Sequence, residues 1–149
     1  MTEVEFLAWL PGVRDGYADD MVRNGGAEAN AAREKAEQDT ERLFPGGRPT
    51  SEQLVFVIET EGERVGELWL CEREGDFRHV LWVFDVQVDE QHRGRGFARA
   101  AMEFAEQEAR RRGLSHVALN VFGGNEQARG LYRSLGYTED AISMSKAVG

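Results

Sequence analysis

The residues whose types and spacing best suit chemistry are two glycines, Gly94 and Gly96, which follow an apolar strand and precede a helix. Such a junction presents several backbone N–H groups together with the positive end of the helix dipole. Glycines let a ligand approach the backbone closely. Arg93, Arg95 and Arg99 add positive charge at the same place. The segment therefore predicts a site for an anion, most naturally a phosphate.

Other glycine-rich phosphate loops fit this segment less well. Gly94-x-Gly96 begins like a dinucleotide-binding fingerprint, but Arg99 stands where that pattern needs Gly or Ala, and no second parallel βαβ unit follows. A P-loop hydrolase is excluded because the chain has no Gly-Lys-Ser or Gly-Lys-Thr sequence. A tight turn that binds nothing is the structural alternative.

A second candidate group lies downstream, where Asn125 follows two glycines and opens a short helix. Tyr132 lies two helical turns further on, so its side chain projects from the same face as Asn125. Each residue alone also has a purely structural interpretation. Asn125 is a good helix N-cap, and Tyr132 can pack beside Leu131 and Leu135.

The elements that must position these residues form one α/β domain over residues 1–149. Hydrophobic periodicity predicts helices at 3–20, 27–44, 96–112 and 125–135. It predicts strands at 54–59, 65–72, 79–88 and 116–122, and a last short strand at 143–146. The order indicates a mixed, mostly antiparallel twisted sheet flanked by helices.

Composition narrows the class of protein. The chain has 149 residues, 41% of them hydrophobic, which is enough for one real core. No run approaches the roughly 20 apolar residues of a membrane span, and the N-terminus does not have the pattern of a secretory signal. The one cysteine, Cys71, lies in an apolar run and predicts an inert buried thiol, and three scattered histidines give no metal cluster. We expect a soluble cytoplasmic protein without a metal.

Charge is divided unevenly along the chain. The net charge is −9, which argues against nucleic acid or an anionic membrane as a partner. Residues 1–90 hold 21 acids and 9 bases, whereas residues 91–149 hold 6 acids and 9 bases. A solvated surface is enough to explain the excess. The alternative is an anionic ligand held by the C-terminal half and a cationic one met by the N-terminal half.

Together, the two groups of residues resemble the GNAT superfamily of N-acetyltransferases over essentially the whole chain. The cofactor motif of that family is matched by the run from Arg93 to Ala98, Arg-Gly-Arg-Gly-Phe-Ala, which includes Phe97. Its later motif is matched by Asn125, by Leu131-Tyr132 and by the pair Gly136-Tyr137. Both motifs occur in the expected order and at the expected spacing.

The resemblance implies acetyl-CoA as the acyl donor and assigns roles to individual residues. The amides of residues 94–99 would hold the pyrophosphate, and the main chain of Val86 and Val88 would pair with the pantetheine arm. Asn125 would bind the amide region of the cofactor. Tyr132 would lie beside the thioester sulfur and give the departing thiolate its proton.

The resemblance does not identify a general base. The positions where many family members carry a carboxylate or a histidine hold Trp82, Phe84 and Asn120. Asp85 is the nearest carboxylate on that strand, and Glu67 lies on the neighbouring one. An unpaired buried carboxylate is costly, so Asp85 serves either as the base or in a structural hydrogen bond.

The implied reaction is transfer of an acetyl group to a primary amine by direct attack within a ternary complex. Three alternatives stay open: an acyl-CoA-binding sensor of the same fold, acyl transfer to a hydroxyl or of a longer acyl group, and a purely structural partner protein. The sequence leaves open which amine is the acceptor.

Overall fold

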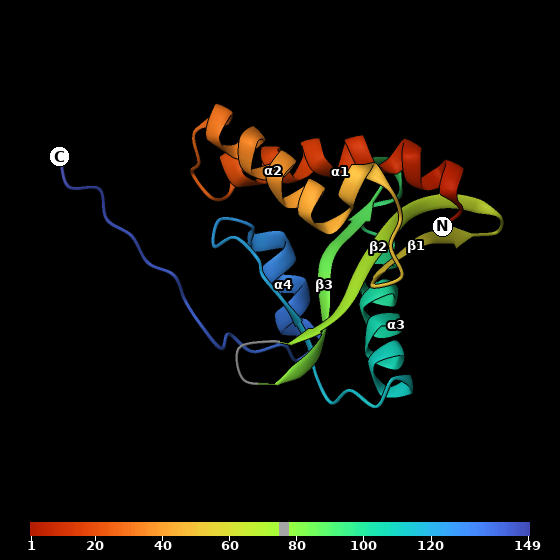
Figure 1. Cartoon of the computed structure of the whole chain (residues 1–149). Helices are drawn as coiled ribbons and strands as arrows, with labels where there is room; N and C mark the ends of the chain where they lie inside the picture. Colours follow the sequence, from red (N-terminus) through yellow and green to blue (C-terminus); the bar gives the residue numbers. More distant parts are fainter. Residues whose placement is uncertain (75–77) are drawn as a thin grey trace.

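The computed structural model describes residues 1–74 and 78–149. Its helices in these ranges are α1 (Glu3–Arg23), α2 (Ala29–Leu43), α3 (Phe97–Arg111) and α4 (Glu126–Ser134), with short 3-10 turns η1 (Pro45–Gly47) and η2 (Glu90–His92). Its strands are β1 (Gln53–Thr60), β2 (Glu63–Glu74), β3 (His79–Val88) and β4 (Val117–Leu119). Figure 1 shows their arrangement.

The helix ends follow from local capping. At the start of α1, Thr2 and Glu5 form a capping box, in which each side chain accepts a hydrogen bond from the backbone N–H of the other residue. At the start of α2, the carboxylate of Glu28 accepts hydrogen bonds from two backbone N–H groups. α3 differs, because its N-cap Gly96 has left-handed geometry and supplies no capping side chain. The first amides of α3 are therefore not satisfied by a cap.

The strands form one mixed sheet in the order β1-β2-β3-β4. β1 pairs antiparallel with β2, and β2 pairs antiparallel with β3. β4 runs parallel to β3 and pairs only with its residues 81–83. These pairings confirm the predicted fold class.

Helices cover both faces of this sheet (Figure 1). On one face lies an aromatic cluster in which α1 and the end of α2 meet β2, made of Phe6, Trp9, Val13, Phe44 and Trp69. On the other face, small side chains of α3 let the helix pack closely on the leucines and valines of β2 and β3. α4 adds half-buried side chains to the rim of this second cluster, among them Tyr132 and Leu135.

Two predicted strands differ from the structure. The strand predicted at 116–122 is limited to Val117–Leu119, because Phe122 leaves the sheet to pack against the small-residue cluster between α1 and α2. The short strand predicted at 143–146 does not form: residues 138–149 have no regular secondary structure, and their side chains are exposed. Figure 1 shows this C-terminal segment leading away from the rest of the chain.

Candidate active site

The predicted anion loop presents its backbone amides to the outside. Gly94 and Gly96 have φ values of 73° and 86°, a conformation that favours glycine at both positions. Within the described residues, the N–H groups from Gly94 to Arg99 have no backbone acceptor. The first hydrogen bond of the helix is donated by the Ala100 N–H to the Gly96 carbonyl, at 3.0 Å. The loop is largely exposed. Amides at the start of a 15-residue helix therefore converge on open space.

The three arginines of the loop hold it in shape. Arg93 Nε donates to the carbonyl of Val88 at 3.0 Å, which ties the loop back to the end of β3. Arg95 lies 3.2 Å from Nδ1 of His92. Arg99 reaches across to α4, where its guanidinium donates to Ser134 Oγ. The arginines predicted to attract an anion therefore also hold the loop in place through these contacts.

The edge of β3 next to the loop is unpaired on the side of β4. β4 pairs with β3 only from Leu81 to Val83, whereas β3 continues to Val88. On its other side, Val86 lies opposite Leu68 and Val88 opposite Gly66 of β2. The main chain around Val86 and Val88 therefore has one edge without a neighbouring strand among the described residues, which suits the addition of an extended ligand.

A β-bulge in β3 determines where Asp85 lies. The register with β2 shifts so that Trp69 lies opposite Asp85 and Leu70 opposite Val83, leaving Phe84 as the extra residue. Residues directly opposite share a face of the sheet, so Asp85 lies on the face of Trp69. The ring of Phe84 stacks on Trp69 with 4.6 Å between centroids. The bulge thus places Asp85 beside an aromatic surface instead of within the α3 core.

The surroundings of Asp85 favour its protonated form. Burial raises the pKa of its carboxyl from 3.8 to about 7, and the negative charges of Glu67 and Asp20 add to the rise, against a hydrogen bond from the Val86 N–H. Within the described residues Asp85 has no ion-pair partner. A carboxyl with this pKa exchanges a proton readily at neutral pH.

Tyr132 projects from α4 toward the same region. Its ring is half-buried and lies 5.9 Å from the ring of Tyr137. Burial raises the pKa of the Tyr132 phenol to about 12, and the charges of Asp85 and Asp20 contribute. The phenol therefore stays protonated throughout the physiological range, within the field of the Asp85 carboxyl.

Two more carboxylates act on Asp85, and one of them, Asp20, also acts on Tyr132. Glu67 is buried and accepts a hydrogen bond from Arg64 at 3.1 Å. Asp20 of α1 is half-buried and accepts a hydrogen bond from Asn24. Sequence reasoning did not identify Asp20, although its spacing carries a signal. It follows Phe6 and Val13 at intervals of seven, which places an acid on the buried face of an amphipathic helix.

The remaining sequence candidates have clear positions. Asn125 is the N-cap of α4, and its Oδ1 accepts a hydrogen bond from the Ala128 N–H at 3.2 Å. Cys71 is buried, and burial raises the pKa of its thiol, as expected of an inert cysteine. Asn120, one of the positions where the resemblance to the family led us to look for a base, is exposed.

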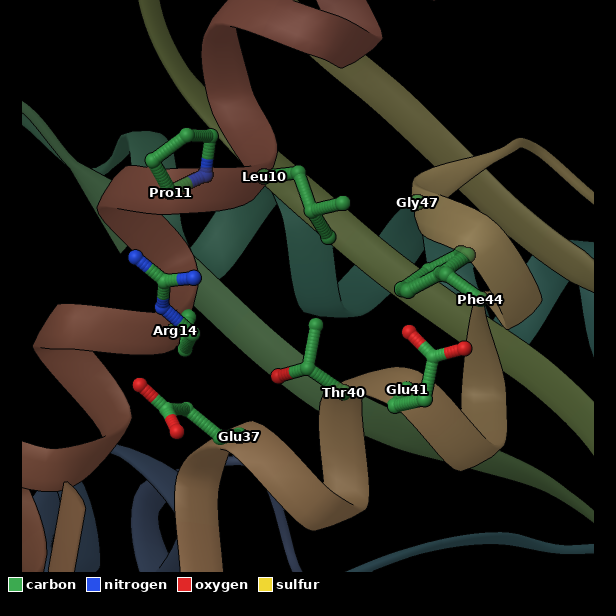
Figure 2. Close-up of a pocket in the computed structure, with 8 residues that line it drawn as sticks. All are labelled: Leu10, Pro11, Arg14, Glu37, Thr40, Glu41, Phe44 and Gly47. Atoms are coloured by element: carbon green, nitrogen blue, oxygen red, sulfur yellow. The ribbon is translucent and has the colours of Figure 1, made fainter. Parts of the chain in front are cut away.

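A cavity of about 280 Å³ lies elsewhere, between α1, α2 and η1. Figure 2 shows Leu10 of α1 and Thr40 of α2 extending toward one another across it, with Arg14 and Glu37 at one side. No predicted site residue lines this cavity. The candidate site is instead the region bounded by the free edge of β3, the amide loop and α4.

The geometry is suited to proton transfer next to a bound anion. A phenol that stays protonated and a carboxyl that titrates near neutrality flank one region, and an amide-lined helix start lies next to it. Within residues 1–74 and 78–149, no cluster of three or more His, Cys, Asp or Glu side chains could hold a metal. Among the helices of those ranges, none combines the length and apolar character that crossing a membrane requires.

Comparisons with known proteins agree on one family. The acetyltransferase (GNAT) family matches residues 16–137. The uncharacterized N-acetyltransferase YdgE of Bacillus subtilis is 33% identical over 98% of this chain and 94% of its own length. A crystal structure of YycN from Bacillus subtilis, 29% identical, superposes with a TM-score of 0.88 and covers 99% of this chain and 95% of that one. A GCN5-related N-acetyltransferase from Ralstonia eutropha shares the fold at 23% identity, with a TM-score of 0.71 over 95% of this chain and 94% of that one.

Proposed function

This chain belongs to the acetyltransferase (GNAT) family, and from that premise we propose that it transfers the acetyl group of acetyl-CoA to a primary amine, with Asp85 and Tyr132 moving the protons. The observation that carries the proposal is the placement of these two side chains. The charge of a carboxyl whose pKa is near 7 contributes to raising the pKa of the Tyr132 phenol to about 12, so the two side chains are close enough for that charge to act. Asp85 belongs to the part of β3 beyond Val83 that does not pair with β4 among the described residues.

The residues around the loop fit acetyl-CoA, which supplies an acetyl group activated as a thioester. The amides from Gly94 to Arg99 suit the pyrophosphate, and each hydrogen bond to a charged group contributes about 1.5–3 kcal/mol. The free edge at Val86 and Val88 suits an extended arm with amide groups. The side chain of Asn125 keeps its amide nitrogen available for such an arm while its oxygen caps α4.

The amine must lose a proton before it can attack. An alkylammonium with a pKa near 10.4 costs roughly 4–5 kcal/mol to neutralise at pH 7. The ammonium loses this first proton to solvent before attack, and Asp85, which is partly ionised at that pH, takes the second proton from nitrogen as the bond from nitrogen to the acetyl carbon forms. Backbone N–H groups of β3 are suited to stabilising the developing oxyanion.

The bond from carbon to sulfur breaks in the same reaction, and the sulfur needs a proton. Tyr132 holds one, but its raised pKa makes it a weak acid compared with a thiol, whose pKa is near 8.5. Full transfer from Tyr132 alone would therefore run uphill by about 3.5 pKa units. The proton that Asp85 acquires from nitrogen restores the phenol, so that this second proton balances the one gained by the thiol, whereas the first proton of the ammonium goes to solvent.

The acceptor we propose is a cationic amine that carries a second positive charge. Asp20, Glu67 and Asp85 place three carboxylates near the proposed reaction centre. Residues 1–90, which contain all three, carry the acidic excess of the chain. Such an acceptor keeps one ammonium charged against the carboxylates while its other amine reacts.

Thiol release from acetyl-CoA across a library of amines tests the function. We expect turnover with at least one diamine or polyamine and slower turnover with monoamines of the same length. Thermal shifts with acetyl-CoA, longer acyl-CoAs, NAD and ATP complete the test. Stabilisation by acyl-CoA without turnover on any amine would indicate a sensor, and stabilisation by NAD or ATP alone would contradict the donor assignment.

A further inference from the structure

The cavity of about 280 Å³ between α1, α2 and η1 takes no part in the proposed reaction, because none of the residues that line it belongs to the candidate active site. Pockets for drug-sized ligands measure about 300–1,000 Å³. This cavity therefore suits a smaller molecule, of the size of a single amino acid, and not a nucleotide or a coenzyme.

The floor of the cavity is apolar and firmly held. Leu10 of α1 and Phe44, which follows α2, supply its apolar side chains. Phe44 is fully buried, and its ring centroid lies 5.0 Å from that of Phe6 and 5.0 Å from that of Trp69. Gly47 leaves the floor open, since a Cβ there would already lie 3.8 Å from Leu10 Cδ2. The aromatic contacts fix this surface before any ligand binds, as is usual for small-molecule sites.

The rim of the cavity carries two opposite charges that do not neutralise each other. Arg14 of α1 and Glu37 of α2 lie at the same end of the cavity, whereas Phe44 and Gly47 lie at the other end (Figure 2). Within residues 1–74 and 78–149, the only ion pair of Arg14 joins its Nε to the exposed Asp15, at 3.3 Å, and Glu37 forms none. The terminal nitrogens of Arg14 and the carboxylate of Glu37 can therefore both bind a ligand.

Two further polar residues complete the rim. Glu41 accepts a hydrogen bond from the Gly46 N–H at 3.0 Å, so its carboxylate already holds η1 in place. The side chain of Thr40 extends across the cavity toward Leu10 (Figure 2), and a threonine hydroxyl both donates and accepts hydrogen bonds. The charged end of the cavity thus offers partners for a carboxylate and for an ammonium group, and its other end offers an apolar surface.

We propose that this cavity binds a free α-amino acid with an apolar side chain. The α-carboxylate pairs with the guanidinium of Arg14, whose planar fork suits bidentate contact. The α-ammonium group lies against Glu37 and the hydroxyl of Thr40, and the side chain of the ligand packs on Leu10 and Phe44. An amine without a carboxylate would leave its charge beside that of Arg14, and an acid without an ammonium group would lie beside Glu37. This inference does not depend on the reaction that the chain catalyses.

An NMR titration of the backbone amide signals of the full chain is the first test, because it shows where a ligand binds. The probes are L-valine, L-leucine and L-methionine. We expect saturable shifts centred on residues 10–14 and 37–47, and not on Asp85 and Tyr132. Three relatives of L-leucine should each bind at least about tenfold more weakly than L-leucine: 3-methylbutylamine, which lacks the carboxylate, 4-methylpentanoate, which lacks the ammonium group, and glycine, which lacks the apolar side chain.

Arg14→Gln and Glu37→Gln assign the two charged groups of the ligand. Arg14→Gln should weaken the binding of L-leucine at least about tenfold without weakening that of 3-methylbutylamine. Glu37→Gln should weaken the binding of L-leucine as much without weakening that of 4-methylpentanoate. Arg33→Gln and Glu34→Gln are the matched controls, because both residues are exposed on α2 and neither lines the cavity. Both controls should bind L-leucine as the wild type does.

The proposal would be overturned if none of the three amino acids bound saturably. Shifts centred on Asp85 and Tyr132 would also overturn it, since the amino acid would then be an acceptor at the reaction centre. So would equal affinities for L-leucine and 3-methylbutylamine, or an Arg14→Gln variant with the affinity of the wild type.

Discussion

The charge of Asp85 acts on the phenol of Tyr132, because the bulge in β3 and the start of α4 bring a strand residue and a helix residue into one region. After burial, this charge is the main cause that raises the pKa of Tyr132 to about 12. Asp85 itself has a raised pKa of about 7, so its charge varies across the physiological range. Removing the charge of Asp85 should therefore lower the pKa of the Tyr132 phenol.

Stability should depend on pH through Asp85. The folded carboxyl has a pKa of about 7 against an ordinary value of 3.8, so between these values the folded chain keeps a proton that the unfolded chain has lost. The free energy of unfolding then falls as pH rises, by up to about 1.4 kcal/mol per unit. Asp85→Asn has no carboxyl to titrate at this position, so this fall in the free energy of unfolding disappears. Relative to wild type, we expect the variant to gain on the order of 2–4 kcal/mol between pH 4 and pH 8.

Urea denaturation at several pH values measures this gain. Asp19→Asn is the control, since Asp19 is an exposed acid on α1 and its replacement should give no pH-dependent difference. A constant difference between Asp85→Asn and wild type from pH 4 to pH 8 would contradict the raised pKa.

The pH dependence of acetyl transfer should reflect the ionisation of Asp85. If ionised Asp85 accepts the proton of the amine, kcat/KM rises as pH passes through about 7. Asp85→Asn should lower kcat/KM about 10²-fold or more at pH 8 and remove this rise, leaving only the ionisation of the amine near 10. A variant that keeps the inflection near 7 would exclude Asp85 as the base.

Acetyl-CoA binding should depend on Gly96. Its φ is 86°, and a side chain there would point into the space on which the loop amides converge. Gly96→Asp adds both bulk and a negative charge, so we expect calorimetry to detect no binding of acetyl-CoA. Gly113→Asp is the matched control: Gly113 has φ 73° and equally open surroundings at the opposite end of α3. It should cost similar stability and leave affinity unchanged, whereas loss of binding in both variants would indicate misfolding.

The acidic excess should attract the amine substrate. Attraction between exposed charges is screened over about 8–10 Å near physiological salt, so the KM for the amine should rise with ionic strength. Asp20→Asn removes one of the three carboxylates and keeps an acceptor for Asn24. We expect it to raise the KM for the amine several-fold, to weaken its salt dependence, and to leave the KM for acetyl-CoA unchanged. Asp19→Asn, at the exposed neighbouring residue, is the control and should change neither the KM for the amine nor its salt dependence. If the KM of the wild type did not depend on ionic strength, the acidic excess would serve solubility alone.

The periodicity of the sequence predicted most of the scaffold. Six elements occur within a few residues of their predicted bounds: the helices α1, α2 and α3 and the strands β1, β2 and β3. Each of them repeats apolar residues at the spacing of its own secondary structure. β3 begins and ends where it was predicted, at 79 and 88. The loop from Gly94 to Arg99 was also predictable. Its two glycines have positive φ angles, a conformation that few other residue types adopt, so their presence in the sequence indicates such a turn.

The bulge and the acidic surroundings of the site were not predictable. β3 is apolar on both faces, so its alternation does not reveal that Phe84 is the extra residue or that Asp85 consequently faces Trp69. Glu67 and Asp20 come from distant segments and act on Asp85 only through the tertiary fold. The strand pattern at 143–146 was visible in the sequence, but the sequence could not show whether a partner edge is available to it.

Tyr132 should contribute to kcat through its hydroxyl and not through its ring. The ring packs against the α3 cluster and Tyr137, and Tyr132→Phe keeps these contacts. The phenol stays protonated up to a pKa of about 12, so the wild-type rate should show no loss from its ionisation below about pH 10. We expect Tyr132→Phe to lower kcat about 10²-fold or more while the affinity for acetyl-CoA changes little.

Tyr137→Phe separates this role from packing, because the two tyrosines are neighbours and the Tyr137 hydroxyl is enclosed without a hydrogen-bond partner among residues 1–74 and 78–149. Removing a hydroxyl that makes no hydrogen bond should cost no stability and leave kcat within about twofold of wild type. Equal kcat losses in both variants would indicate that the phenols act through packing. A full rate for Tyr132→Phe would mean that the sulfur receives its proton from Asp85 or water. Direct protonation by Asp85 would be downhill in that case, because its carboxyl has a pKa near 7 and the thiol a pKa near 8.5. The double variant of Tyr132→Phe and Asp85→Asn should then lose no more kcat than Asp85→Asn alone.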